Sequence, residues 1–290
     1  MDAPLILIAS YPKSGNTWTR VVLHGLLDAA SAGELNALNA DLYGGSKRAL
    51  FDEYAPAEMA DLSAEQIDDL LPEMYRSAIA PSAAPILLKT HERLRQNRTG
   101  EWVVPTDRVR CVICVVRHPF DVAASFAHHM GYTAEEVIAH MGSPFWFAPQ
   151  VTEASFAPPE FVDTWSRNVL SWMENSSPYR TLVLRYEDLL EDDEAGFRRV
   201  ADTAGVPYTE ALLQNVVAKA RFDKLQAKEQ QEGFRERPRT SSHFFRSGKS
   251  MSWVDFLPDS ARQRVVQDHG ELMSHFGYND DGTTTKVSTY

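Results

Sequence analysis

Four short apolar runs are separated along the chain by longer segments in which apolar residues recur every three or four positions. The apolar runs predict buried strands, at Leu5–Ala9, Ile86–Leu88, Val109–Val116 and Thr181–Leu184. The helical spacing is clear in three segments, Ser63–Ile79, Phe161–Glu174 and Asp193–Ala204. Strands that alternate with helices predict an α/β fold, with a mainly parallel β-sheet flanked by helices.

Neither an internal repeat nor a low-complexity linker divides the 290 residues, so we expect a single domain over 1–290. Two stretches without clear periodicity, Leu38–Pro56 and Gly142–Pro159, are expected to be irregular. Over 226–253 the residues become polar and charged, which predicts a lid or closing loop. The small polar residues of 280–290 predict a flexible tail.

The formal net charge of −11 argues against a protein that coats nucleic acid or an anionic membrane, since both need a broad basic surface. No apolar run is long enough to span a membrane, and the first residues lack the basic start of a signal peptide.

Cys111 and Cys114 lie three positions apart on a predicted strand and face opposite ways, so they can neither form a disulfide nor chelate a metal. Reduced thiols point to a reducing compartment, and we expect a cytoplasmic protein. The pattern does not indicate an oligomeric state.

The first candidate site follows the first predicted strand, in the stretch "LIASYPKSGNTWTR" (Leu7–Arg20). The strand breaks at a proline and gives way to a helix, whose N-terminus offers unpaired N–H groups and a partial positive charge. Lys13 adds a full charge, and Gly15 lets the backbone approach a ligand closely. Three short side chains add hydrogen-bonding groups: Ser14, Asn16 and Thr17. Residues 5–20 therefore predict a phosphate or sulfate site; the alternative is a helix capped by Ser14 or Asn16, with Lys13 in solvent.

A second candidate anion site lies at the end of the strand Val109–Val116, within 109–129. Arg117 stands where this strand meets a new helix, a place from which a guanidinium can fork onto a phosphate. Ser125 on that helix can donate a second contact. The alternative is a structural arginine paired with a carboxylate.

A third candidate, Lys89 with His91, follows the strand Ile86–Leu88. Ligands gather at the carboxyl ends of parallel strands, so His91 is a candidate general base. The alternative is a histidine with an ordinary surface or core role. His128 and His129 are rivals for the base, ranked lower because a surface role is expected a helical turn beyond Ser125.

Together these segments resemble the cytosolic sulfotransferase family. The chain's "YPKSGNTW" is similar to that family's "YPKSGTTW", "RHPFDVAAS" to its "RNPKDVAVS", and "YEDL" to its "YEDL", while "KTH" matches its "KTH". The resemblance implies a P-loop-like strand–loop–helix that binds 3′-phosphoadenosine 5′-phosphosulfate (PAPS), although the kinase loop G-x-x-x-x-G-K-S/T is absent. It also implies transfer of a sulfonate group to a hydroxyl of a small-molecule acceptor, without a metal, with adenosine 3′,5′-bisphosphate (PAP) as product.

The resemblance also implies roles for single residues. Lys13 would stabilise charge on the leaving phosphate, His91 would act as general base, and Lys89 would orient the sulfonate. The remaining donor-binding residues would be, for the 5′-phosphate, Ser14, Gly15, Asn16 and Thr17; for adenine, Trp18, Tyr186 and Phe222; and for the 3′-phosphate, Arg117, Ser125, Arg246, Ser247 and Gly248.

The closing loop departs from the family pattern "RKGxxGxW". It appears here as "RSGKSMSW", so Ser247 replaces a lysine and Met251 replaces the second glycine. One charge contact to the 3′-phosphate is then missing, unless Lys249 substitutes. Phe222 stands in "ARF" where the family has "TSF", so a threonine contact is lost.

Two other functions stay open: a nucleotide kinase, disfavoured by the missing kinase loop, and a nucleotide-binding scaffold without turnover. The acceptor is also open, among a phenol, a sugar hydroxyl, a lipid and a peptide natural product. Five aromatic residues either line an apolar acceptor pocket or pack beneath a loop: Tyr43, Phe51, Phe145, Trp146 and Phe147.

Overall fold

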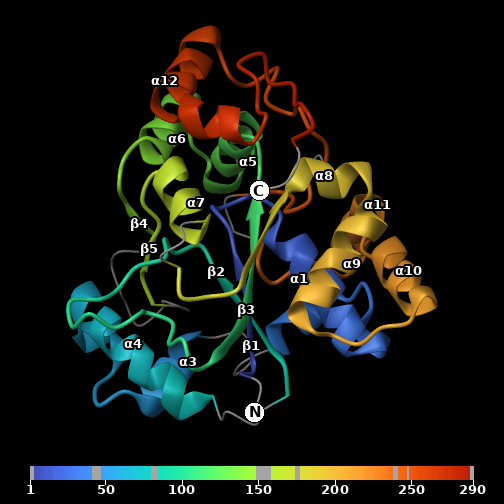
Figure 1. Cartoon of the computed structure of the whole chain (residues 1–290). Coiled ribbons are helices and arrows are strands. Elements are labelled where there is room, and N and C mark those ends of the chain that lie inside the picture. Colours follow the sequence, from blue (N-terminus) through green and yellow to red (C-terminus); the bar gives the residue numbers. More distant parts are fainter. Residues whose placement is uncertain are drawn as a thin grey trace.

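The computed structural model describes residues 3–40, 47–79, 84–147, 158–173, 177–237, 241–246 and 248–287. Its central sheet has four parallel strands in the order β2-β1-β3-β6 (Figure 1). These strands are β1 (Leu5–Ala9), β2 (Ile86–Thr90), β3 (Val109–Val116) and β6 (Thr181–Arg185). A separate antiparallel pair consists of β4 (Trp146–Phe147) and β5 (Glu160–Phe161). The prediction of an α/β fold with a parallel sheet is confirmed.

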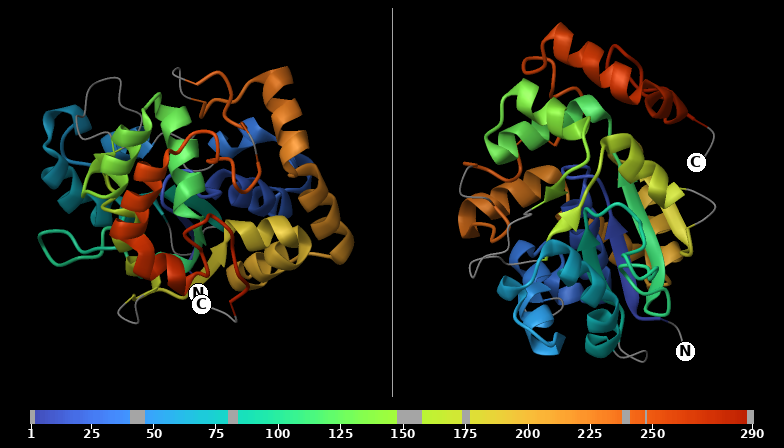
Figure 2. Two further views of the ribbon diagram at one scale, coloured as in Figure 1. Left: turned by 90° about the horizontal axis from the view of Figure 1, so that it is seen from above. Right: turned by 90° about the vertical axis from the view of Figure 1, so that its left-hand side faces the viewer.

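Helices cover both faces of the sheet (Figures 1 and 2). The first face carries α3 (Lys47–Tyr54), α4 (Ala64–Ala78), α5 (Pro119–Met130), α6 (Ala134–Met141), α7 (Trp165–Met173) and α12 (Asp259–His275). The second face carries α1 (Asn16–Leu27), α8 (Tyr186–Glu191), α9 (Asp193–Ala204), α10 (Glu210–Lys219) and α11 (Phe222–Glu232). Short 3₁₀ turns lie at Ala29–Ser31, Leu35–Ala40 and Met59–Asp61.

Packing of helices on both faces of the sheet explains why the strands are continuous apolar runs in the sequence. Leu5, Leu7 and Ala9 of β1 pack into the core on one face, while Ile6 and Ile8 pack into the core on the other. A strand buried on both faces needs apolar residues at every position rather than at alternate ones.

The two cysteines of β3 lie on opposite faces, as the sequence predicts. Cys111 belongs to one core and Cys114 to the other, and both are free thiols. Burial raises the pKa of Cys111 to about 11 and that of Cys114 to about 12, so both stay protonated.

Three segments differ from the sequence interpretation. The expected helix over 161–174 begins only at Trp165, because Phe161 pairs with Trp146 in the β4–β5 ribbon. The stretch expected to be irregular over 38–56 contains α3. The expected lid begins as helix α11, and its buried Glu229 accepts hydrogen bonds from the N–H groups of Phe244 and Phe245.

The described part of the expected flexible tail, 280–287, folds back onto the domain. The N–H of Thr285 donates to the carbonyl of Gly277 (2.8 Å), and Arg185 Nη1 donates to the carbonyl of Thr285 (2.7 Å). These contacts anchor residues whose composition alone suggests fraying.

Candidate active site

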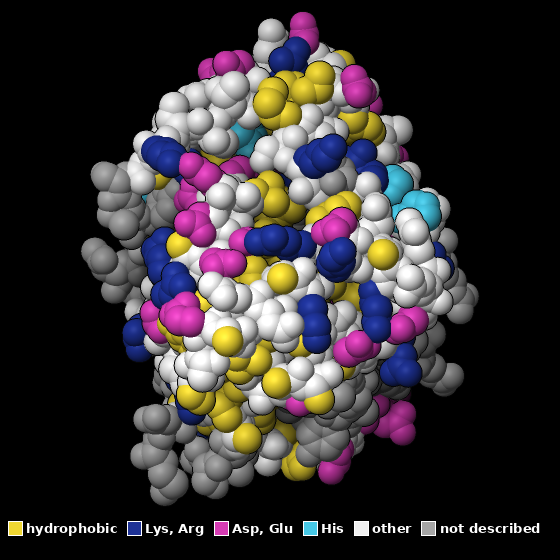
Figure 3. Space-filling view, turned by 90° about the vertical axis from the view of Figure 1, so that its right-hand side faces the viewer, with side chains coloured by type: hydrophobic (Ala, Val, Ile, Leu, Met, Phe, Trp, Pro, Cys, Tyr) yellow, Lys and Arg dark blue, Asp and Glu magenta, His cyan; other side chains and the backbone are white. Residues whose placement is uncertain are grey.

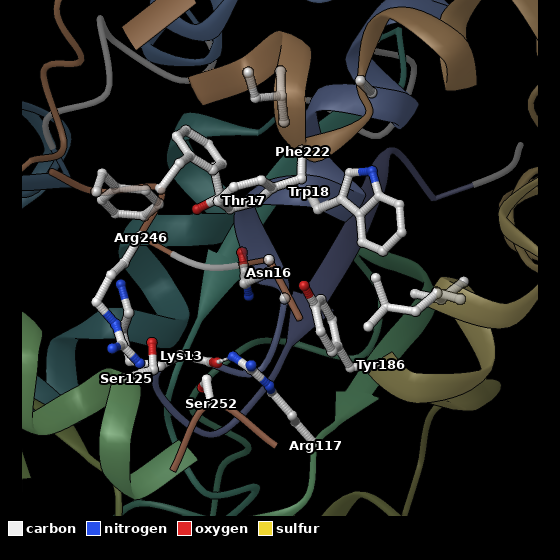
Figure 4. Close-up of a pocket in the computed structure, with 18 of the residues that line it drawn as sticks. Lys13, Asn16, Thr17, Trp18, Arg117, Ser125, Tyr186, Phe222, Arg246 and Ser252 are labelled. Carbon is white, nitrogen blue, oxygen red and sulfur yellow. Dashed lines mark hydrogen bonds between the residues drawn. The ribbon is translucent and has the colours of Figure 1, made fainter. Parts of the chain in front are cut away.

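A cavity of about 510 Å³ lies where β1, β2, β3 and β6 end (Figure 4). Nearly all the site residues expected from the sequence line it: Lys13, Gly15, Asn16, Thr17, Trp18, Lys89, His91, Arg117, Ser125, Tyr186, Phe222, Arg246 and Gly248. Ser14 is fully buried and is not part of the wall, and Ser247 lies outside the described residues. The fold therefore brings six segments of the sequence into one site: 13–18, 89–91, 117–125, 186, 222 and 246–248.

The turn between β1 and α1 has the geometry of an anion cradle. Lys13 and Gly15 both have left-handed backbones, with φ of 69° and 111°. A Cβ on Gly15 would lie 2.8 Å from the ring of Tyr186, so glycine is required there. Helix α1 has neither a side-chain cap nor an acidic residue in its first turn, which removes the alternative of a self-capped helix. Its N-terminal dipole is directed at the turn.

Asn16 supports this turn from beneath. Its Nδ2 donates to the carbonyl of Ile8 (2.9 Å) and to Ser10 Oγ (3.3 Å), so its amide fixes the end of β1. The sequence predicts that the Asn16 side chain holds a phosphate; in this structure its amide nitrogen donates to Ile8 and Ser10.

Lys13 points into the cavity rather than into solvent. Its Nζ lies 3.1 Å from Nδ1 of His129 and 4.1 Å from the centre of the Phe244 ring. Burial, together with the charges of Arg117 and Lys89, lowers the pKa of Lys13 to about 7. Lys13 therefore begins to lose its proton near pH 7.

Arg117 is buried and held mainly by carbonyl groups. Its Nη1 donates to the carbonyl of Lys13 and its Nη2 to that of Lys249, both at 3.2 Å. Its guanidinium lies 4.5 Å from the centre of the Tyr186 ring. The nearest carboxylate in the described chain, that of Asp121, is 3.9 Å away. This long ion pair between buried side chains partly fits the alternative of an arginine paired with a carboxylate, although the guanidinium also lines the cavity.

Asp121 fixes the closing loop to α5. Its carboxylate accepts hydrogen bonds from the N–H groups of Met251 (2.9 Å) and Ser252 (2.7 Å) and from Ser252 Oγ (2.8 Å). Trp253 packs edge-on against Phe120, with centroids 5.0 Å apart. Figure 4 shows Ser125 and Arg246 at one side of the cavity, with Trp18 and Phe222 at the other.

The two departures in the closing loop have different consequences. Met251 has φ of 60°, so the conformation that favours glycine is kept by a methionine. Gly248 remains indispensable, because a Cβ there would lie 2.1 Å from the Phe222 ring. Lys249 contributes its carbonyl to Arg117, but it does not line the cavity. The expectation that Lys249 replaces the missing lysine therefore finds no support.

The imidazole of His91 is oriented by the end of β1. Its Nδ1 lies 2.9 Å from the carbonyl oxygen of Ser10, and Asn168 Nδ2 donates to the carbonyl of His91 (2.9 Å). Because a carbonyl only accepts, Nδ1 carries the proton and Nε2 carries the lone pair.

An ion-pair cluster that we did not expect closes one wall. Glu236, from the lid, accepts hydrogen bonds from Arg20 Nη1 (2.8 and 3.1 Å) and from Lys89 Nζ (3.1 Å). Burial opposes its ionisation, but Lys89 and Arg20 outweigh it and lower the pKa of Glu236 to about 2. The signal available in the sequence was a single acid in the basic stretch "FRERPR".

Histidines gather in the same cavity. His128, His129 and His243 line it together with His91, so the surface role expected for His128 and His129 is wrong. His128 Nε2 lies 3.3 Å from Ser241 Oγ.

Three of the five aromatic residues considered for an acceptor pocket are described with their side chains, and these three do not line this cavity. Phe51 is fully buried in the core, Phe145 packs near Phe126 with centroids 6.4 Å apart, and Trp146 lies against Phe161. Tyr43 lies outside the described residues, and only the backbone of Phe147 is described. The packing alternative therefore holds for Phe51, Phe145 and Trp146.

On the face shown in Figure 3, Lys and Arg side chains are interspersed with Asp and Glu rather than gathered into one basic surface. Within the described chain, no helix is long and apolar enough to cross a membrane. No group of three or more His, Cys, Asp or Glu among the described residues is arranged to hold a metal ion.

Fold and cavity together define an α/β protein whose cavity lies at the carboxyl edge of a parallel sheet, beside the turn between β1 and α1. The chain matches the model of the sulfotransferase domain over residues 3–277, and it belongs to that family. Cytosolic sulfotransferase 15 of Arabidopsis thaliana is 24% identical over 280 residues, covering 90% of this chain and 69% of the relative. Flavonol 3-sulfotransferase of Flaveria bidentis is 20% identical over 285 residues, covering 90% and 78%.

Two solved structures of retinol dehydratase share the fold. The complex with androsterone and inactive cofactor PAP has a TM-score of 0.59 at 21% identity, and covers 94% of this chain and 81% of that one. The complex with retinol and PAP has a TM-score of 0.57 at 19% identity, with 94% and 82% covered.

Proposed function

We propose that this sulfotransferase-family protein transfers the sulfonate group of PAPS to a hydroxyl group of a small molecule. The observation that carries the proposal is one cavity lined by two sets of anion-binding groups. Lys13 and the α1 N-terminus form the first set, and Arg117 with Ser125 and Arg246 forms the second. A nucleotide with phosphate groups at both its 5′ and 3′ positions matches two such sets, whereas ATP, with phosphates at its 5′ position alone, needs only the first.

The residues present fit such a nucleotide. Arg117 Nε is a buried polar atom without a hydrogen-bond partner among the described residues, and Arg117 lines the cavity. Buried donors of this kind are costly unless a ligand satisfies them. Trp18, Tyr186 and Phe222 offer ring surface to a base, and the missing Cβ atoms of Gly15 and Gly248 leave room for close approach.

The chemistry assigns one task to each reactive side chain. PAPS supplies an activated sulfonate bonded to a phosphate. The Lys13 ammonium would stabilise the negative charge that develops on the departing phosphate. His91 Nε2 would accept the proton of the acceptor hydroxyl, with Nδ1–H held by Ser10. Lys89 would help to orient the sulfonate from its ion pair with Glu236.

The name of one relative and the ligands in two related structures support a small organic acceptor. One acts, by its name, on a flavonol, and two structures contain retinol or androsterone beside PAP. Within that class we do not choose between a phenol, a sugar hydroxyl, a lipid and a peptide natural product. A cytoplasmic location, as the name of the Arabidopsis relative suggests, stays a prediction.

The direct test is transfer of ³⁵S from labelled PAPS to a panel of phenols, sugars, sterols and peptides, with release of PAP followed in parallel. Product labelled on a hydroxyl supports the proposal, and EDTA is expected to leave its rate unchanged because Lys13 supplies the cation. Phosphate transfer from γ-labelled ATP without any sulfonate transfer would favour the kinase alternative. PAP binding without turnover on any acceptor class would favour the scaffold.

A further inference from the structure

We propose that His129 is a positioning residue for Lys13: its neutral imidazole accepts a hydrogen bond from the ammonium and holds that charge in the cavity. The inference rests on the proposed function for its catalytic meaning, but the pairing itself can be tested without any transfer reaction.

The geometry comes from α5 and the lid together. His129 lies one helical turn after Ser125 on α5, and both line the cavity. Lys13 and Ser125 lie on the same side of the cavity in Figure 4. The Nζ atom of Lys13 lies 3.1 Å from His129 Nδ1. The Phe244 ring lies 4.1 Å from that Nζ and meets the imidazole edge-on, with centroids 5.7 Å apart. The Lys13 ammonium group thus contacts an imidazole and an aromatic ring at the same time.

The direction of the hydrogen bond fixes the tautomer of His129. An ammonium group only donates, so Nδ1 must accept and the proton of the neutral ring must lie on Nε2. Burial and the neighbouring Lys13 lower the pKa of His129 to about 3, so the ring stays neutral at physiological pH. His91 has the opposite tautomer, with its proton on Nδ1. The two histidines therefore have different tasks: His91 can accept a proton through Nε2, whereas His129 is committed to Lys13.

The charges around Lys13 explain why such an acceptor is needed. Burial is the main cause that destabilises its charged form; the cations Arg117 and Lys89 add to it, and the acids Glu236 and Glu229 on the lid partly compensate. His91 and His128 also face His129. Because these effects lower the pKa of Lys13 to about 7, a hydrogen bond to the ammonium helps Lys13 to keep its proton at neutral pH. A neutral lysine would not stabilise charge on a departing phosphate.

The test compares two substitutions of His129. His129→Leu removes the acceptor, whereas His129→Asn keeps an acceptor oxygen near the position of Nδ1. His128→Leu is the matched control, since His128 contacts Ser241 rather than Lys13. The readout is the pH dependence of Lys13 acylation by acetic anhydride, mapped by peptide mass spectrometry without nucleotide. Melting temperatures of all variants establish that they are folded.

We expect the apparent pKa of Lys13 to fall by about one pH unit in His129→Leu, because a hydrogen bond to the charged form is lost. It should stay near the wild-type value in His129→Asn and His128→Leu. Turnover should fall about tenfold or more in His129→Leu. The KM for PAPS should rise as well, because a less charged Lys13 attracts the phosphate more weakly, and both values should recover in His129→Asn.

An unchanged labelling profile in His129→Leu would overturn the proposal, whatever its turnover. Loss of turnover in both His129 variants with unchanged labelling of Lys13 would instead indicate that His129 contacts the molecule that receives the sulfonate. A shifted profile in a protein that transfers no sulfonate at all would leave the pairing established and refute the proposed function alone.

Discussion

His91 Nδ1 lies 2.9 Å from the carbonyl oxygen of Ser10. Ser10 directly follows β1 and His91 directly follows β2, and these strands are neighbours with Ala9 opposite Thr90. The parallel pairing of two apolar strands therefore orients the His91 imidazole. In the proposed role as general base, an imidazole held in this way needs no reorganisation before it accepts a proton.

Replacing His91 by alanine should lower turnover by about a hundredfold or more, because a positioned base contributes about 10²–10⁴ to the rate. Binding of PAP, measured by calorimetry, should barely change, since the proposed role concerns the acceptor. If His91→Ala keeps near-normal turnover while His128→Ala abolishes it, the base is misassigned although the sulfotransferase reaction stands.

PAP should raise the melting temperature far more than AMP or ATP, because only PAP has a phosphate for the corner at Arg117, Ser125 and Arg246. A ligand at a hundred times its dissociation constant stabilises a protein by about 2.7 kcal/mol. Thermal unfolding at equal nucleotide concentrations is the measurement, and Ser125→Ala should narrow the difference between PAP and AMP. Equal shifts with all three nucleotides would refute a 3′-phosphate site.

Met251→Gly should stabilise the protein by up to about 1 kcal/mol. A left-handed backbone costs a non-glycine residue about 1–2 kcal/mol, and the greater freedom of glycine in the unfolded chain cancels part of that gain. Met251 is exposed, so little packing is lost. The neighbouring Ser250 is also exposed and lacks positive φ, so Ser250→Gly should be neutral or destabilising in the same urea titration. A loss of stability in Met251→Gly equal to that in Ser250→Gly would contradict this account of the closing loop.

The sequence predicts the parts of the site that depend on the order of residues within one short segment. A lysine and a glycine between an apolar strand and a helix indicate the anion turn, and the parallel sheet brings Arg117 and His91 to the same edge. Glu236 could not be predicted in this way, because its partners Arg20 and Lys89 lie 216 and 147 residues away in sequence. The same holds for the tail, which is anchored by Arg185 across the fold.

Glu236→Gln should destabilise the protein by about 2 kcal/mol at pH 7, because it leaves the buried Arg20 and the half-buried Lys89 without their carboxylate. The folded-state pKa of Glu236 is lowered to about 2, below that of an unfolded glutamate near 4.3. Its contribution is therefore complete above about pH 5 and is lost as the pH falls toward 2.

The measurement is urea unfolding of both proteins between pH 7 and pH 3. Glu232→Gln is the control, since Glu232 pairs at the surface with Lys228 within the described chain and its loss should change stability little. A difference between wild type and Glu236→Gln that does not shrink below about pH 4 would contradict the assignment.

PAP should bind less tightly as the pH rises above about 7, because Lys13 then loses the charge that attracts a phosphate. Burial is the main cause of its low pKa, and Arg117 and Lys89 add to it; the value is about 7 instead of the usual 10.5. An anionic ligand prefers the ammonium form, so binding is strongest below that pKa and weakens by at most about tenfold per pH unit above it. The nucleotide's own phosphates are fully ionised over pH 7.5–9 and do not obscure the trend.

Calorimetric titrations of PAP binding over pH 7.5–9 should show this loss of affinity, together with uptake of up to one proton. Lys13→Met should bind weakly at every pH without the trend, whereas Lys249→Met, outside the cavity, should behave as wild type. A pH-independent affinity in the wild type would show that Lys13 does not contact the nucleotide through its charge.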